Sequence, residues 1–177
     1  ADILIVETVF DTLNCKAVLY AIDQFLEEQK KEIPLMVSGT IVDASGRTLS
    51  GQTLEAFWIS ISHMNLLSVG LNCALGAEQM RPFLEELNRL APINVSVYPN
   101  AGLPNEFGEY EETPEITARL LGEFADSGFV NIAGGCCGTT PAHIRKIAEV
   151  MQNKKPRIIP DPPRFTRFSG FEALTIR

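Results

Sequence analysis

Long apolar runs, basic clusters and nucleotide-binding motifs are all missing from this sequence. No stretch of about 18 consecutive apolar residues occurs, so we expect no membrane-spanning helix and no membrane partner. The 15 Lys and Arg against 22 Asp and Glu give a formal net charge of −7, and the basic residues form no cluster. This balance argues against nucleic acid as the main partner. No glycine-rich phosphate fingerprint follows any apolar run, so a nucleotide-binding fold has little support.

Cysteine is scarce as well, with four in 177 residues. A disulfide-rich secreted scaffold carries a much higher share, so this usage suits a reducing compartment and we expect a cytoplasmic protein. The N-terminus has no basic region followed by a signal-type apolar stretch. It also lacks an initiator Met and begins inside an expected strand, which leads us to expect a piece of a longer chain.

What the sequence does contain is a regular alternation of short apolar runs and helical patterns. Hydrophobic residues make up 45%, enough for a sizeable core. The nearly continuous apolar runs, typical of strands buried on both faces, are Ile3–Val6, Leu35–Val42, Leu66–Leu71, Ile93–Tyr98 and Phe129–Ala133. The helical patterns are Leu13–Gln29, Thr53–His63, Ala77–Leu90, Pro114–Ser127 and a last helix that starts at Pro141 after an N-cap at Thr140. Strand–helix alternation without a hairpin signal predicts an α/β fold with parallel strands.

Unusual residues cluster after the expected strands, and their placement favours a barrel. Periodicity alone does not separate a doubly wound sheet from a barrel, but barrel enzymes build their sites from the loops that follow several strands. The residues at such positions are Glu7, Asp11, Asp43, Asn72, Cys73, Asn100, Cys136 and Cys137. Five βα units are an incomplete (β/α)8 TIM-type barrel, which typically needs about 250 residues, so we expect its C-terminal portion. We assign residues 1–153 to this partial barrel and 154–177 to an extended linker toward a following domain.

Three cysteines carry the strongest chemical signal. Cys136 and Cys137 are adjacent, and neighbouring Cα atoms lie ~3.8 Å apart, below the ~4.4–6.8 Å of a disulfide. Cys73 arrives from the end of another strand. Three thiols that do not bridge suggest one metal ion, and zinc, which favours thiolates, is the best candidate. Three protein ligands would leave a fourth position open for chemistry.

The adjacent pair requires a special backbone. Side chains alternate along a regular strand, so Cys136 and Cys137 cannot both face one metal unless a sharp turn redirects them. We expect the glycines at 134, 135 and 138 to allow that turn, and the helix starting at Pro141 to favour ionised thiols with its positive end. The alternative interpretation is that these are buried free cysteines, as we expect for Cys15.

Several motifs together resemble the zinc-dependent homocysteine S-methyltransferases. They are Gly134–Pro141 (GGCCGTTP), Gly70–Cys73 (GLNC) and Val6–Thr8 (VET). Three further stretches look like the homocysteine-binding domain of the cobalamin-dependent methionine synthases, namely 38–43, 45–53 and 98–105. The resemblance extends to Phe168–Gly170, which looks like the start of a connection to a folate-binding domain.

The resemblance implies a (β/α)8 barrel in which Cys73, Cys136 and Cys137 hold Zn²⁺ and thereby serve catalysis. The sulfur of homocysteine takes the open position and, as a thiolate, attacks a methyl group to give methionine. The implied donor is methylcobalamin on another module, with folate and cobalamin domains downstream in the same polypeptide. This chain itself contains no Asp-x-His-x-x-Gly stretch of the cobalamin module.

Further site residues follow from the same resemblance. Glu7 is implied to hold the amino group of homocysteine through a charge-assisted contact; the alternative is a solvated glutamate near a helix start. Asn100 is implied to fill the open metal position when substrate is absent. We expect Asn72, Ser38 and Thr40 to line the same pocket.

Other interpretations remain open at this stage. One is a stand-alone methyltransferase using S-methylmethionine or betaine. Another is a structural zinc module without catalysis, although structural sites normally have four protein ligands. Thiol redox work by Cys136–Cys137 lacks the usual two-residue spacing. We also expect His143 to be exposed on the last helix, and the 177-residue chain alone to be poorly stable or to associate.

Overall fold

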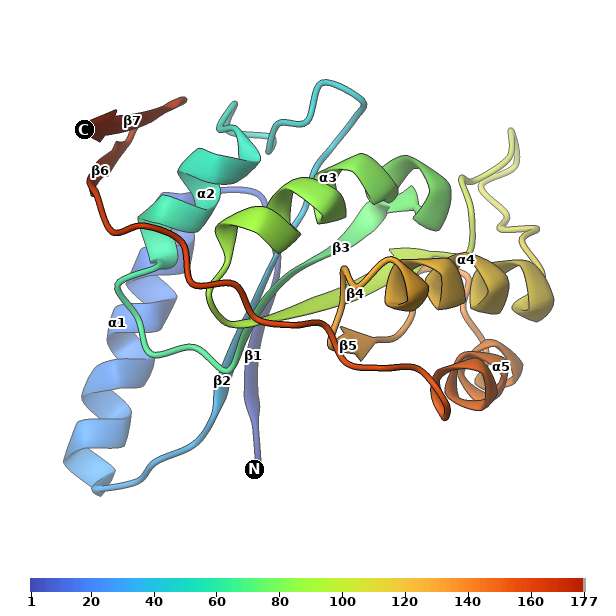
Figure 1. The fold of residues 1–177 in the computed structure, drawn as a ribbon, viewed down its shortest axis with the longest axis horizontal. Helices are drawn as coiled ribbons and strands as arrows, with labels where there is room; N and C mark the ends of the chain where they lie inside the picture. Colours follow the sequence, from blue (N-terminus) through green and yellow to red (C-terminus); the bar gives the residue numbers. More distant parts are fainter. Residues whose placement is uncertain (177) are drawn as a thin grey trace.

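The computed structural model describes residues 1–176 and has a five-stranded parallel sheet at its centre (Figure 1). The βα elements are β1 (Leu4–Val9), α1 (Thr12–Gln29), β2 (Leu35–Gly39), α2 (Leu54–Ile61), β3 (Ser68–Gly76), α3 (Ala77–Leu90), β4 (Asn94–Asn100), α4 (Pro114–Asp126), β5 (Ile132–Ala133) and α5 (Pro141–Met151). The strands follow one another in the order β1-β2-β3-β4-β5, and each pair is parallel. Each helix packs beside the next one in the chain. The predicted five βα units of a TIM-type barrel are therefore confirmed.

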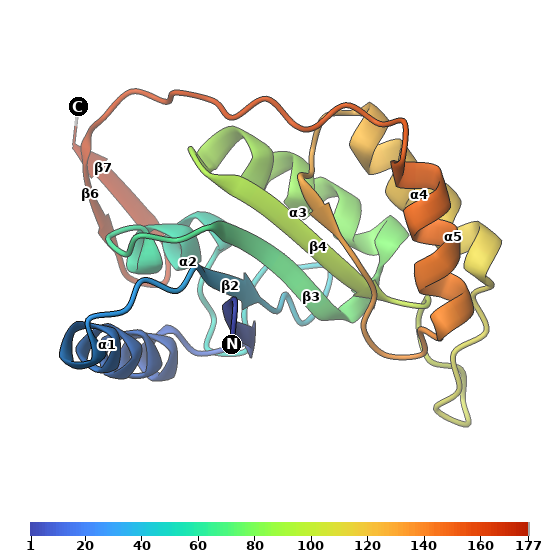
Figure 2. The same cartoon turned by 90° about the horizontal axis from the view of Figure 1, so that it is seen from below.

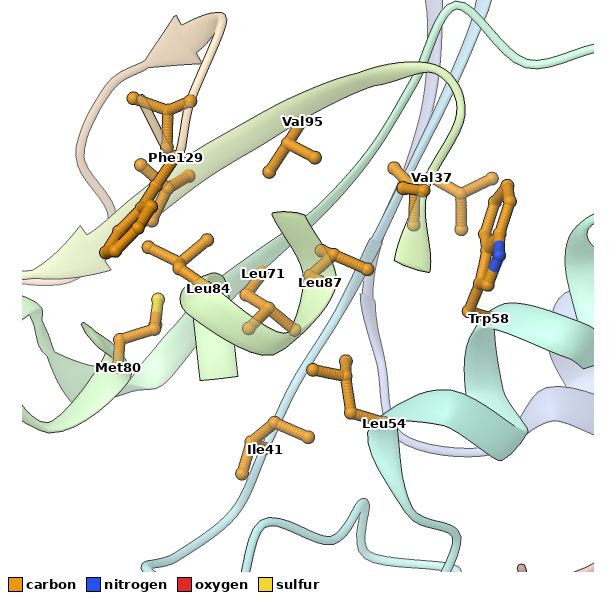
Figure 3. Packing of buried hydrophobic residues seen from close by; sticks show 14 of the residues in the cluster. Val37, Ile41, Leu54, Trp58, Leu71, Met80, Leu84, Leu87, Val95 and Phe129 are labelled. Atoms are coloured by element: carbon orange, nitrogen blue, oxygen red, sulfur yellow. The ribbon is translucent and has the colours of Figure 1, made fainter. Parts of the chain in front are cut away.

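One face of the sheet packs against the helices and forms the core. Val37, Val69 and Val95 lie in one row across β2, β3 and β4, and all three are fully buried. Figure 3 shows Val37 and Val95 within the cluster of side chains that α2 and α3 bring to this face. Burying apolar surface in this way supplies the main stabilisation of the fold.

The opposite face is small and polar. Ser38, Gly70 and Ser96 share one row across the same three strands. A Cβ atom on Gly70 would lie 2.1 Å from the Ser96 hydroxyl oxygen, so the row has room only for glycine at that position. The prediction of strands buried on both faces is confirmed for β2, β3 and β4, although their second face is not apolar; it is wrong for β1, in which Ile5, Glu7 and Thr8 are exposed. On the second face, which points away from the helices, a barrel has its interior.

His143 corrects one expectation, because it is buried and not exposed. It lies in the first turn of α5 and is only 5% accessible. Its Nδ1 accepts hydrogen bonds from the backbone N–H of Thr140, at 3.2 Å, and faces the Thr140 hydroxyl at 2.9 Å. Its Nε2 lies 2.8 Å from the carbonyl oxygen of Glu112. The helical pattern hid this burial because the covering segment comes from the loop before α4.

The C-terminal segment adds a hairpin that the sequence pattern did not predict. After α5 the chain runs extended along the ends of α3 and β4 and then reaches α2 (Figure 2). Arg157 anchors this run, since its buried guanidinium donates to the carbonyls of Ala91 and Ile93, both at 2.7 Å. The strands β6 (Thr166–Ser169) and β7 (Ala173–Ile176) then form an antiparallel pair that packs on α2. The expectation that the fold contains no hairpin is therefore wrong.

Both edges of the parallel sheet are open within residues 1–176. Strand β1 pairs only with β2, and β5 pairs only with β4. Apolar side chains remain exposed at these edges, including Ile5 on β1 and Ile144 on α5 near β5. None of the helices in the described part of the chain is both long and apolar enough to cross a membrane.

Candidate metal centre

The structure brings the three predicted cysteines together. Cys73 lies in the irregular end of β3, and Cys136 and Cys137 follow β5. The sulfur of Cys137 lies 3.6 Å from that of Cys73 and 3.9 Å from that of Cys136, and all three sulfurs lie within 4.8 Å of one another. Within residues 1–176, no other group of at least three His, Cys, Asp or Glu side chains is arranged to hold a metal ion.

These distances match the geometry of a zinc–thiolate site. Zinc–sulfur bonds of about 2.3 Å at tetrahedral angles place two ligand sulfurs about 3.8 Å apart. The two separations from the Cys137 sulfur, 3.6 and 3.9 Å, bracket that value, and the sulfurs of Cys73 and Cys136 lie within 4.8 Å of each other. The three thiols thus fit three corners of one tetrahedron and leave the fourth corner to another ligand.

Hydrogen bonds to the end of β4 hold the cysteine pair in place. The backbone N–H of Cys136 donates to the carbonyl of Pro99 at 2.8 Å. The N–H of Cys137 donates to the side-chain Oδ1 of Asn100 at 3.1 Å, and the carbonyl of Cys137 accepts from Ala101 at 2.9 Å. Beyond the two residues of β5, the chain therefore stays attached to β4 while leaving the strand conformation. This departure lets neighbouring side chains face one point.

Two of the three glycines around the pair are required by the turn. Gly138 has φ of 77°, in the left-handed region that favours glycine. A Cβ on Gly135 would lie 2.4 Å from the Thr139 side chain. Gly134 has ordinary room for a side chain, its nearest neighbour being Tyr98 at 3.5 Å. The prediction that glycines shape this turn is thus confirmed for positions 135 and 138 and not for 134.

Backbone strain also marks the other side of the site. Cys73 and Ala74 have φ of 61° and 56°, where the pairing of β3 with β4 shifts register. Thr8, at the matching end of β1, has φ of 56°. The only other non-glycine residue with positive φ in the described chain is Lys30, which ends α1. Left-handed geometry costs roughly 1–2 kcal/mol per residue, and such residues gather at functional sites.

Asn72 connects the expected substrate-binding residues. It is fully buried; its Oδ1 accepts the N–H of Thr8 at 3.1 Å, and its Nδ2 donates to the Thr8 hydroxyl at 2.8 Å. The same Nδ2 lies 3.5 Å from a carboxylate oxygen of Glu7, which is exposed. The Thr40 hydroxyl donates to the carbonyl of Asn72 at 3.0 Å. Glu7, Thr40, Asn72 and Cys73 therefore meet at one end of the sheet.

Ser38 lies deeper on the same inner face. Its hydroxyl is buried and has no hydrogen-bond partner among the described residues. The same holds for the hydroxyls of Ser68, Ser96 and Tyr98, all on β3 or β4. Buried polar groups are normally paired, so these hydroxyls leave hydrogen-bonding capacity on the inner face.

The Cys136 thiol resists ionisation without a cation. Burial raises the pKa of Cys136 to about 11, and the neighbouring Cys73 and Cys137 contribute in the same direction. A bound divalent cation would supply the missing compensation, since metals deprotonate the thiols that they coordinate. Cys15 lies in α1 outside the cluster and packs in the core, as expected. Burial raises the pKa of its thiol to about 11 as well.

The sequence interpretation missed two tyrosines near the cluster. The buried phenol of Tyr98 has its pKa raised to about 12, mainly by burial, and Glu7 and Cys136 are among the charges that add to the shift. Tyr110, in the loop before α4, lies against Gly138 and beside Cys137. Tyr98 lies two positions before Asn100 on β4, and residues two apart on a strand point to the same face. This spacing could have assigned Tyr98 to the inner face. Tyr110 has no comparable local signal.

A hollow in the described chain lies away from the thiols. It measures about 790 Å³ and is lined by residues at the amino ends of the strands, among them Pro34, Leu66 and Pro92. In barrel enzymes the chemistry is found at the carboxyl ends of the strands, where the thiols are. The cluster, and not this hollow, is therefore the candidate site.

A parallel βα sheet with three thiols that converge at the carboxyl ends of two strands defines a protein of the barrel class with a cysteine cluster able to hold a metal ion. Residues 1–151 match the homocysteine S-methyltransferase family, and the chain belongs to that family. The fold is similar to the crystal structure of the homocysteine methyltransferase MmuM from Escherichia coli in its apo form, with a TM-score of 0.62 and 22% identity. That similarity covers 85% of this chain and 49% of MmuM, so the chain spans about half the length of this solved structure.

Proposed function

We propose that this chain forms the zinc- and homocysteine-binding part of an enzyme that transfers a methyl group to the homocysteine thiol and so makes methionine. The observation that carries the proposal is the convergence of the three cysteine sulfurs to within 4.8 Å of one another. Membership of the homocysteine S-methyltransferase family supports the same activity.

The cysteines take the role of metal ligands in this proposal. Cys73, Cys136 and Cys137 hold Zn²⁺ as thiolates, and the β4 hydrogen bonds keep the last two in place. When bound, zinc would keep the sulfur of homocysteine deprotonated and nucleophilic. The Oδ1 of Asn100 accepts a hydrogen bond from the backbone N–H of Cys137 and so lies beside the cysteine turn. This oxygen has a second lone pair, which suits the expected role of Asn100 as a metal ligand when substrate is absent.

The substrate's amino acid end needs groups of its own. Glu7 is exposed at the end of β1 and offers a carboxylate to the ammonium group, and Asn72 holds the adjoining Thr8 backbone. Thr40 fixes Asn72 through its carbonyl. The unpaired hydroxyl of Ser38 offers a further hydrogen bond on the inner face. These contacts would select an amino acid thiol over a simple thiol.

For the methyl donor, we propose methylcobalamin on another module of the same polypeptide. The stretches 38–43, 45–53 and 98–105, which resemble the cobalamin-dependent enzymes, support this choice. S-methylmethionine and betaine are the alternatives. Supplying each donor in turn to the full-length protein with homocysteine separates them: methionine formed only with methylcobalamin supports the proposal, and turnover with either alternative contradicts it.

The first test is zinc content with and without homocysteine. We expect about one zinc per full-length wild-type protein, and loss of that zinc in Cys136→Ala. Cys15→Ala is the matched control, since Cys15 lies outside the cluster. X-ray absorption should change when homocysteine is added, because a new sulfur enters the coordination sphere. Bound zinc whose X-ray absorption spectrum does not change on addition of homocysteine would instead indicate a structural zinc module.

A further inference from the structure

The end of β1 and the turn into α1 are bonded at several points to one neighbouring segment, residues 40–53 between β2 and α2. The carbonyl of Val9 accepts from the N–H of Thr40 at 2.8 Å. The carbonyl of Phe10 accepts from the N–H of Ser50 at 3.2 Å. The position of the turn therefore follows the position of this segment.

A side-chain hydrogen bond joins the two segments again at the first residue of α1. The Thr12 hydroxyl donates to the Oε1 of Gln52 at 2.6 Å, and both residues are buried, with 8% and 9% of their surface accessible. A cleft of about 360 Å³ lies beside this bond and is lined by both residues. Because the cleft leaves fewer packing contacts, the hydrogen bond is a larger part of what holds the start of α1 in place.

The hairpin β6–β7, which lies beside α2 (Figure 1), holds the same segment. The other end of the Gln52 amide, Nε2, donates to the carbonyl of Gly170 at 2.8 Å. The N–H of Thr53 donates to the carbonyl of Phe171 at 2.9 Å. Gln52 is therefore bonded at one end of its amide to the start of α1 and at the other end to the hairpin turn.

Glu7 depends on this arrangement through the residue that follows it. Thr8 has φ of 56°, and its N–H donates to the Oδ1 of Asn72. A strained conformation of this kind persists only while the surrounding structure holds it. A shift of the turn after β1 would therefore reach Glu7, whose exposed carboxylate lies 3.5 Å from the Nδ2 of Asn72.

We propose that Thr12 and Gln52 are positioning residues for Glu7: their hydrogen bond fixes the turn after β1, and the Gln52 amide ties that turn to the hairpin. This role rests on the proposed function, in which Glu7 receives the ammonium group of homocysteine. Because a charge-assisted contact depends on distance and angle, a displaced carboxylate loses part of its preference for an amino acid thiol. The Thr12 hydroxyl thus contributes to selectivity without touching the substrate.

Affinity for two thiols separates positioning from general stability. Homocysteine and 4-mercaptobutanoate, which lacks only the amino group, are titrated calorimetrically into the zinc-loaded full-length protein. In Thr12→Val we expect the preference for homocysteine, the ratio of the two dissociation constants, to fall about 5-fold, with the affinity for 4-mercaptobutanoate unchanged. Gln52→Ala, which removes the acceptor of the same hydroxyl, should have the same effect. Thr12→Ser keeps the hydroxyl and should restore the wild-type preference.

Thr117→Val is the matched control. Thr117 is fully buried near the start of α4, and its hydroxyl also donates at 2.6 Å to a side chain, that of Glu112. Loss of this bond destabilises the protein without touching the turn after β1, so we expect an unchanged preference. A fall equal to that of Thr12→Val would show that lost stability alone produces the effect, and would overturn the positioning role.

Amide exchange provides a second readout, which needs no substrate. Residues 7–10 should exchange roughly 5-fold faster in Thr12→Val than in wild type, with exchange in β3 as the internal reference.

The outcomes separate this inference from the proposed function. If Glu7→Gln lowers the preference for homocysteine but Thr12→Val does not, the positioning role is overturned and the role of Glu7 stands. If the wild type binds the two thiols equally well, or Glu7→Gln keeps the full preference, the proposed role of Glu7 fails and the positioning role fails with it.

Discussion

Individual residues in strained or crowded positions surround the thiol cluster. Thr8, Cys73 and Ala74 all have positive φ angles at the carboxyl end of the sheet. Asn72 accepts a hydrogen bond from the Thr8 backbone N–H and donates one to the Thr8 hydroxyl, so surrounding contacts maintain at least part of this geometry. The strained backbone directs side chains differently from a regular strand, and Cys73 is an example.

Gly138 gives the sharpest prediction at this scale. Gly138→Ala combines a left-handed backbone with overlap against Tyr110, and we expect a loss of about 3 kcal/mol in the free energy of unfolding, together with loss of metal binding. Gly108→Ala is the control, because Gly108 has φ of 79° but no atom within 4 Å of an added Cβ. It should lose only about 1 kcal/mol. Equal losses in urea unfolding of the two variants would contradict the packing argument.

At the scale of elements, the contacts between loops and helix ends matter more than the helices themselves. The helices α4 and α5 begin where the sequence predicts, because N-cap, proline and apolar spacing are all local signals. The strand β5 has only two residues of the expected five, since its pairing with β4 begins at Ile132 and residues 129–131 lie outside the strand. Hairpin β6–β7 escaped prediction because its pairing depends on docking to α2.

The buried histidine of α5 can be tested at this scale. His143→Ala removes the partner of the Thr140 N–H and of the Glu112 carbonyl, and unpaired buried groups cost about 1–3 kcal/mol each. We expect a loss of about 3 kcal/mol in chemical denaturation. His63→Ala, at the exposed other histidine, should stay within about 0.5 kcal/mol of wild type. If His143→Ala left the free energy of unfolding unchanged, the imidazole would make no net contribution to stability.

The docking of the hairpin is a second element-scale prediction. Gln52 accepts from the Thr12 hydroxyl at 2.6 Å and donates to the carbonyl of Gly170 at 2.8 Å, joining α1 to the hairpin turn. Gln52→Ala should weaken docking by about 1–2 kcal/mol, so amide exchange of residues 166–176 should speed up roughly 10-fold. Exchange in β3 serves as the internal reference. Unchanged exchange in the hairpin would show that apolar contacts with α2 suffice.

At the scale of the whole molecule, the sequence predicted the order of units but not the character of the inner face. The rows of valines were expected, whereas Ser38, Gly70 and Ser96 were included in runs taken as apolar. Short polar residues within a buried strand are the signal that was overlooked. The three cysteines were predicted because glycines and strand ends mark them locally. Tyr110 was not, because its contact with Gly138 joins residues far apart in the sequence.

The open edges lead to the prediction at this scale. A groove of about 310 Å³ beside β5 is lined by Val130, Ile144 and Met151, and Ile5 is exposed on β1. Exposed strand edges with apolar flanks promote association. We therefore expect residues 1–177 expressed alone to elute as oligomers or to unfold without cooperativity. A monomeric, cooperative transition in sizing chromatography and thermal unfolding would contradict this expectation.

The parallel direction of every strand in the central sheet restricts what can complete it. Two copies joined edge to edge would contribute ten strands, whereas a closed barrel of this type has eight. Self-association therefore cannot reproduce the closed ring and would leave the two thiol clusters in a wider, distorted enclosure. Closing an eight-stranded barrel around this sheet requires three further βα units. A segment that supplies three strands can therefore complete the barrel, whereas a second copy of the chain, which supplies five, cannot.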